Sequence, residues 1–221
     1  MTFSRITVLA SGRGSNLASL LAAQQRGRLG GTITTVISSH ADVPALAVAG
    51  AHDVAAVVVD HRGFAERAAF DAAIARAIES SNPDVIVLAG FMRILAPEIV
   101  ARHHARMLNI HPSLLPSYPG LHTHRRALAD GVRIHGCTVH FVTDALDHGP
   151  IVAQGAIAVR DDDDEASLAA RVLEVEHRLF PPAVRALCEG RLVIVGNRVH
   201  VKGELVPATA LEVPLAANHE P

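Results

Sequence analysis

Cysteine is scarce in this chain, and its two copies form no motif. Cys137 and Cys188 lie far apart in the 221 residues, with no paired spacing. This excludes a framework of several disulfides and a zinc site built from paired thiolates. Without a companion thiol, we interpret Cys137 as a small buried hydrophobe rather than a nucleophile. Such cysteine usage is typical of a reducing cytoplasm.

Aromatic residues are nearly as scarce. They make up 3% of the sequence, with no tryptophan and one tyrosine, whereas 49% of all residues are hydrophobic. The interior must therefore be built mainly from alanine, valine, leucine and isoleucine. That composition is typical of helices packed on a buried sheet.

An excess of charge of either sign is missing too, as are long apolar runs. Lysine and arginine number 20 against 22 aspartates and glutamates, so the formal net charge is −2. A long nucleic acid would need a basic face, so we expect no nucleic-acid partner. No apolar stretch approaches the roughly 20 residues that span a bilayer, and no signal peptide is recognisable. We therefore expect a cytoplasmic protein with no membrane partner.

What the sequence does contain is an alternation of strand and helix patterns. Apolar runs predict strands at residues 5–10, 32–37, 55–59, 85–89 and 107–110. Helical patterns between them begin at Leu17, Val43, Phe64 and Pro97. This alternation predicts a Rossmann-like, doubly wound α/β fold, with a mostly parallel sheet and helices on both faces.

The second half of the chain predicts an antiparallel C-terminal addition. Its expected strands are residues 138–142 and 151–159, followed by a helix from Glu165 to Leu187 and a hairpin at 192–201. The four acids Asp161–Asp164 before that helix invite a metal interpretation, but such runs more often form a solvated turn that favours a helix N-terminus. We expect one domain, residues 1–203, and a loosely attached tail, residues 204–221.

A glycine turn, Gly12-Arg13-Gly14-Ser15-Asn16, stands between the first predicted strand and helix. Backbone amides and the helix dipole make such a place a phosphate site, although the glycines could equally just shape a tight turn. A dinucleotide fingerprint would need a third glycine where Leu17 stands, and an acid after the second strand. A nicotinamide cofactor is therefore disfavoured.

Asn109 and His111 stand at the end of a predicted strand, where open α/β sheets bind their ligands. The period of two in a strand would aim both side chains the same way. An amide can donate to a developing oxyanion and an imidazole can donate a proton, so the pair suits acyl transfer. A histidine among 14 could also stand there by chance.

Asp144 and Asp147 lie in a turn between two predicted strands, where carboxylates usually stabilise the turn itself. We prefer that structural role for Asp144. Asp147 would gain a chemical role only if the turn folds over the loop after His111, where its carboxylate could orient that ring and hold it charged.

The segment His122-Thr123-His124 invites a metal hypothesis. However, no histidine pair has the helical spacing with an acid that metalloproteases use, and His122 and His124 are expected to flank a loop rather than lie on a helix. We predict no catalytic metal.

Five motifs together identify a family. They are Gly14-Ser15-Asn16, Leu88–Leu95 (LAGFMRIL), Asn109–Pro116 (NIHPSLLP), Tyr118–His124 (YPGLHTH) and Val139–Pro150 (VHFVTD through DHGP). The chain resembles the phosphoribosylglycinamide formyltransferases, the folate-dependent family of purine biosynthesis, from the first strand to about Leu192.

The resemblance implies transfer of a formyl group from 10-formyltetrahydrofolate to the amine of N1-(5-phospho-D-ribosyl)glycinamide, with no metal and no covalent enzyme species. By motif position, Asn109, His111 and Asp147 would be catalytic. Asn109 would bind the oxyanion and His111 would act as the acid that stabilises it. Asp147 would hold His111 charged and help to move protons through water.

Binding residues are implied as well. The acceptor would bind through its phosphate at Gly14, Ser15 and Asn16 and through its sugar at Glu176. The folate site would comprise Arg67, Met92, Arg93, Ile94, Leu95, Asn109, Thr143, Asp144 and Asp147. Three positions depart from the family pattern, namely Arg13, Ser117 and Leu173, and Arg13 could add a cationic contact to the phosphate.

Two alternatives remain at this stage. Another folate-dependent formyltransferase or formyltetrahydrofolate hydrolase would share the motifs, but we expect this chain to have no room for their additional domains. A non-catalytic nucleotide-binding module would need no catalytic trio. We expect small molecules as the substrates or ligands of this protein. We also expect a monomer or a homodimer.

Overall fold

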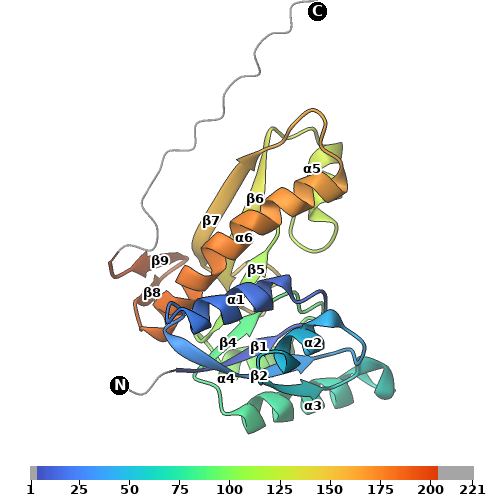
Figure 1. Ribbon diagram of the computed structural model, residues 1–221, viewed down its shortest axis with the longest axis vertical. Helices are drawn as coiled ribbons and strands as arrows, with labels where there is room; N and C mark the ends of the chain where they lie inside the picture. The colour runs from blue at the N-terminus through green and yellow to red at the C-terminus, as the bar shows by residue number, and fades with distance from the viewer. Residues whose placement is uncertain (1–3, 204–221) are drawn as a thin grey trace, which may run out of the picture.

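The computed structural model describes residues 4–203, so the tail expected at 204–221 lies outside the described residues. A nine-stranded sheet runs through the described part, in the order β3-β2-β1-β4-β5-β6-β7-β9-β8 (Figure 1). The strands are β1 (Ser4–Leu9), β2 (Gly31–Ser38), β3 (Ala55–Val58), β4 (Val85–Leu88), β5 (Met107–His111), β6 (Ile134–Phe141), β7 (Ile151–Ala158), β8 (Leu192–Val195) and β9 (Arg198–Val201). The helices are α1 (Ser15–Gln25), α2 (Pro44–Gly50), α3 (Arg67–Ser81), α4 (Pro97–Arg102), α5 (Thr123–Ala129) and α6 (Glu165–Cys188), with a 3-10 turn at His61–Gly63.

The first five strands pair in parallel, and the rest form the antiparallel addition that the sequence predicts. β5 pairs antiparallel with β6, and β6 with β7. β9 then joins β7 in parallel and β8 antiparallel, so the sheet as a whole is mostly parallel. The predicted Rossmann-like α/β fold is confirmed.

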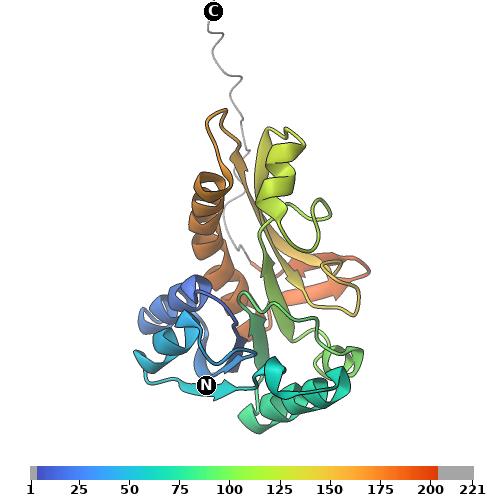
Figure 2. The same ribbon diagram turned by 90° about the vertical axis from the view of Figure 1, so that its right-hand side faces the viewer.

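Helices cover both faces of the sheet, as Figure 2 shows from the side, and an apolar core lies on each face. Alternate residues of β1 supply both, since Ile6 and Val8 face the core under α1, α2 and α6, whereas Leu9 faces the core under α3 and α4. Because both faces are covered at the centre of the sheet, β4 consists of four consecutive buried apolar residues, VIVL.

The acidic run before α6 has the structural role that the sequence favours. The Asp164 carboxylate accepts the backbone N–H of Ser167, and the Ser167 hydroxyl accepts the N–H of Asp164, which together cap α6. The run is not wholly solvated, however. Asp163 is almost fully buried against the Arg171 guanidinium, which ties the start of α6 to the end of β7.

One expectation is wrong. His122 and His124 were expected to flank a loop, but His124 lies within α5 and His122 is its N-terminal cap, in a left-handed conformation with φ of 57°. The short sequence after His122 is rich in arginine, alanine and leucine, which favour a helix. No helix among residues 4–203 is both long and apolar enough to cross a membrane.

Candidate active site

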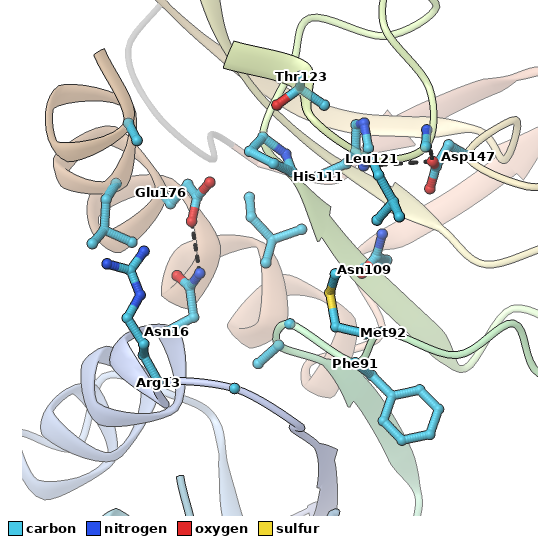
Figure 3. A pocket seen from close by; sticks show the side chains of 18 of the residues that line it. Arg13, Asn16, Phe91, Met92, Asn109, His111, Leu121, Thr123, Asp147 and Glu176 are labelled. Carbon is cyan, nitrogen blue, oxygen red and sulfur yellow. Dashed lines mark hydrogen bonds and ion pairs between the residues drawn. The ribbon is translucent and has the colours of Figure 1, made fainter. Parts of the chain in front are cut away.

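A cavity of about 820 Å³ opens at the carboxyl ends of the parallel strands (Figure 3). Strands β1 and β4 are neighbours, but β1 leads to α1 on one face of the sheet and β4 leads to α4 on the other. Their loops therefore diverge and leave a crevice between them. The loop after β5, the β6–β7 turn and α6 complete the wall. That volume lies within the usual range for small-molecule sites.

Asn109 lies in β5 and lines the cavity, directly opposite His140 in the antiparallel register of β5 and β6. Its Nδ2 atom lies 3.1 Å from Nε2 of His140. The other ring nitrogen of His140, Nδ1, lies 2.9 Å from the carbonyl oxygen of Phe141, which can only accept. Nδ1 therefore carries the proton and Nε2 accepts one N–H of Asn109. Burial lowers the pKa of His140, which favours this neutral ring.

His111 ends β5 and is 6% exposed. Its Nε2 atom lies 2.9 Å from the carbonyl oxygen of Tyr118, and its Nδ1 atom lies 3.5 Å from Oδ2 of Asp147. Both neighbours are hydrogen-bond acceptors, the Tyr118 carbonyl for Nε2 and the Asp147 carboxylate beside Nδ1. An imidazole held in this way beside the Asn109 amide suits the stabilisation of a negative oxygen.

Asp147 reaches His111 because the β6–β7 turn folds over the loop that follows β5, which is the condition under which a chemical role for Asp147 is expected. Its Oδ2 atom accepts the backbone N–H of Gly120 at 2.8 Å, which holds the carboxylate in place. Gly149 lets the turn close, since a Cβ there would collide with the carbonyl oxygen of Phe141. The separation of 3.8 Å between Oδ1 of Asp147 and Nε2 of His140 is too long for a hydrogen bond.

The glycine turn and α6 form the end of the cavity away from Asp147. Gly14 has φ of 79°, and a Cβ there would lie 2.7 Å from Cα of Ala45, so this position needs glycine. Asn16 donates from Nδ2 to Oε2 of Glu176 at 2.7 Å. Glu176 is 6% exposed, and burial raises the pKa of its carboxyl group. The predicted acceptor residues Gly14, Ser15, Asn16 and Glu176 thus lie together on one wall.

A second, smaller hollow of about 90 Å³ adjoins the cavity. Both are lined by Asn109 and Asp147, so these two residues stand where the hollows meet. Most of the predicted folate residues line the smaller hollow, namely Arg93, Ile94, Leu95, Asn109, Thr143, Asp144 and Asp147. Met92, which is 59% exposed, lines the main cavity instead. The Nε atom of Arg93 is buried without a hydrogen-bond partner among the described residues, and the residue lines both hollows.

Arg67 stands apart from the other predicted folate residues, because it lines neither hollow. It begins α3 and pairs with Asp71, and its guanidinium donates to the carbonyl oxygen of Ile94. It therefore holds the loop that carries several of the predicted folate residues, and its direct contact with folate stays a prediction.

His140 and Thr123 are among the polar residues of the site that the sequence did not predict. His140 fixes the Asn109 amide. Thr123 is 3% exposed and lines the cavity beside His111 (Figure 3). The histidines of its segment form no metal cluster within residues 4–203. Instead His124 Nδ1 lies 3.2 Å from Nε2 of His135.

Comparison with known proteins identifies the family. Residues 4–184 match the family model described as formyl transferase. The phosphoribosylglycinamide formyltransferase of Escherichia coli (strain K12) is 43% identical over 202 residues, which cover 91% of this chain and 95% of that protein. The crystal structure of glycinamide ribonucleotide transformylase 1 from Symbiobacterium toebii has a TM-score of 0.87 at 44% identity, covering 90% of this chain and 94% of that one.

A formyltetrahydrofolate deformylase from Pseudomonas syringae pv. tomato is also similar in structure, with a TM-score of 0.83 at 30% identity. The match covers 90% of this chain and 65% of the deformylase. The formyl-transferring and the deformylating relatives thus share this fold. By its sequence match, its relatives and its fold, the chain belongs to the formyl transferase family.

Proposed function

We propose that this protein transfers the formyl group of 10-formyltetrahydrofolate to the amine of N1-(5-phospho-D-ribosyl)glycinamide, giving the N2-formyl product and tetrahydrofolate. The observation that carries the proposal is the position of Asn109 and Asp147, with His111 beside them, where the two hollows meet. A donor in the smaller hollow and an acceptor in the larger one would bring their reacting atoms together at these side chains. The names of the relatives support this pair of substrates.

The chemistry of the site fits a direct transfer. The amine nitrogen attacks the formyl carbon, the bond from that carbon to N10 of the folate breaks, and one proton moves from the amine to N10. Negative charge develops on the formyl oxygen during this exchange. The second N–H of Asn109 is the donor for that oxygen, and the His111 ring beside it stabilises the negative charge electrostatically. Asp147 keeps His111 charged and, through water, relays the proton between the two nitrogens.

The folate wall fits a flat heterocycle with an anionic tail. Leu95, Val100 and Val142 supply apolar surface in the smaller hollow, while Asp144 and Thr143 supply polar groups at its rim. Arg93 lines both hollows, and its guanidinium supplies a cation for a carboxylate of the tail.

Hydrolysis of the same folate is the second candidate, because the structurally similar deformylase gives it a specific basis. In that reaction water would take the place of the amine, and formate would be released. The wall formed by Asn16 and Glu176 favours the amine acceptor, since hydrolysis would have no use for a buried carboxylate held ready for a sugar.

One assay separates these candidates. Purified protein is mixed with 10-formyltetrahydrofolate, with or without the ribosylglycinamide acceptor, and tetrahydrofolate, formate and formylated acceptor are each quantified. We expect stoichiometric tetrahydrofolate and formylated acceptor, and neither product without the acceptor. Release of formate at the same rate with and without acceptor would establish hydrolysis instead.

We also propose that residues 1–203 act as one formyltransferase domain, as a monomer or homodimer in the cytoplasm, on small-molecule substrates alone and without a metal. A single sheet that extends from β1 to β9 supports one domain. Cys137 and Cys188 are free thiols, which supports a reducing compartment. Burial raises the pKa of the Cys137 thiol to about 12, as suits the inert hydrophobe that the sequence predicts.

A further inference from the structure

Arg13 lines the cavity from the turn between β1 and α1. In Figure 3 its side chain extends past Asn16 toward α6, the helix that carries Glu176. Within residues 4–203, no residue forms a hydrogen bond or an ion pair with its guanidinium. An exposed arginine of this kind at a cavity wall has its full donor capacity available for a ligand.

Arg13 is the arginine at the end of the cavity formed by the glycine turn and α6. The lining contains two arginines, Arg13 and Arg93, and the second belongs to the loop after β4 and also lines the smaller hollow. The α6 side of the wall adds no cation, since it consists of Ala169, Leu173, Glu176 and a Glu165 carboxylate already paired with Arg125.

The carboxylate of Glu176 makes a cation necessary here. If the acceptor's sugar binds at Glu176, its phosphate must approach a buried carboxylate, and the two anions repel each other in a poorly solvated wall. The first turn of α1 helps, because Gly14 caps it without a side chain and the amides of Ser15 and Asn16 face no cap. A helix N-terminus alone contributes only about 0.3–1 kcal/mol to anion binding.

A second observation is an unsatisfied polar atom in this wall. Oδ1 of Asn16 is buried and has no hydrogen-bond partner among the described residues, although Nδ2 of the same amide is bonded to Glu176. Buried polar atoms in folded proteins are nearly always satisfied, so an unsatisfied one beside a cavity indicates a donor that a ligand brings.

We propose that Arg13 binds the phosphate of the acceptor and thereby decides whether the phosphorylated sugar or the bare one is preferred. The inference rests on the proposed function, because that function supplies an acceptor with a phosphate. Arg13 also acts on the neighbouring carboxyl group, since its charge lowers the pKa of Glu176 whereas burial raises it. Phosphate and sugar recognition are therefore coupled through this one guanidinium.

The test is a binding cycle that needs no turnover. Calorimetry in the absence of folate gives Kd values for the ribosylglycinamide phosphate and for its dephosphorylated riboside, with wild-type protein, Arg13→Ala and Arg13→Lys. Arg26→Ala is the matched control, because it removes the same charge from the exposed other end of α1. We expect Arg13→Ala to weaken the phosphorylated acceptor about 10-fold and to leave the riboside unchanged. Arg13→Lys should recover part of the loss.

Two results would overturn the inference. The phosphorylated acceptor could bind Arg13→Ala as tightly as it binds Arg26→Ala, or both ligands could weaken equally, which would mean that Arg13 only shapes the wall. If the acceptor fails to bind the wild type, the proposed function fails, and inorganic phosphate then decides the role of Arg13 separately. Phosphate should raise the melting temperature of the wild type and Arg26→Ala but not of Arg13→Ala, and an equal rise in all three would count against the inference.

Discussion

Asp147 lies 3.5 Å from His111, and the same carboxylate oxygen accepts the backbone N–H of Gly120 at 2.8 Å. The carboxylate beside the ring is thus fixed by the backbone of the loop that the ring itself contacts. Such a carboxylate acts by position and by charge together, so a substitution that keeps its shape and removes its charge separates the two contributions.

Asp147→Asn should lower kcat by about 10²-fold or more, because the amide no longer favours a charged His111 or accepts a proton through water. The KM for either substrate should change far less. Initial rates of tetrahydrofolate release measure both constants. Asp162→Asn, an exposed change in the acidic run before α6, is the control and should keep wild-type rates. A kcat within threefold of wild type for Asp147→Asn would remove Asp147 from the mechanism.

His140→Phe should lower kcat about 10-fold, since it removes the acceptor that fixes the Asn109 amide and leaves that amide free to turn. His140→Gln can still accept this hydrogen bond and should retain more of the rate. The KM for the acceptor should stay near its wild-type value in both variants. If phenylalanine and glutamine reduce kcat equally, His140 serves packing and not the orientation of Asn109.

The sequence could predict the parts of this site that depend on residues close together in the chain, and not those that depend on the pairing of distant strands. The strand pattern and the period of two placed Asn109 and His111 at one ligand-binding edge, and the structure confirms that both line the cavity. The role of His140 depends on its register opposite Asn109. Register is set by the pairing of two strands that a long loop separates, and neither strand shows it alone.

The residue patterns alone predicted neither the role of Glu176 nor the short helix α5. Glu176 follows Val172 and precedes Phe180 by four residues each, so it lies on the buried stripe of α6. An acid on an apolar helical stripe predicts a buried functional carboxylate, yet this one was assigned only through the family resemblance. The short α5 was missed because it begins directly after a proline-rich loop, at a histidine in the left-handed conformation.

The stability of the fold should fall as the pH decreases from about 6.5 to about 4, partly because of His135. Burial lowers the pKa of this 1%-exposed histidine to about 4, while the unfolded chain binds the proton near 6.5. Protonation of His135 therefore favours the unfolded state between about pH 6.5 and about pH 4. The neutral ring makes its full contribution to folding stability only above about pH 6.5. The loss amounts to about 3 kcal/mol. Urea unfolding at pH 7, 5.5 and 4.5 should show a shallower dependence for His135→Gln, and equal slopes would contradict this account.

Glu176→Gln should stabilise the protein and impair acceptor binding at the same time. Burial raises the pKa of Glu176, so the folded state pays for ionising it as the pH rises above the usual carboxyl range, whereas the unfolded state does not. Glutamine still accepts the amide N–H of Asn16 but carries no charge. The melting temperature of the variant should exceed that of the wild type more at pH 8 than at pH 5. The acceptor KM should rise about 10-fold, because a carboxylate binds sugar hydroxyls more strongly than an amide does, while the folate KM stays constant. A variant that melts lower than the wild type at pH 8 would show that the Asn16–Glu176 pair stabilises the wall by more than the burial of the charge costs.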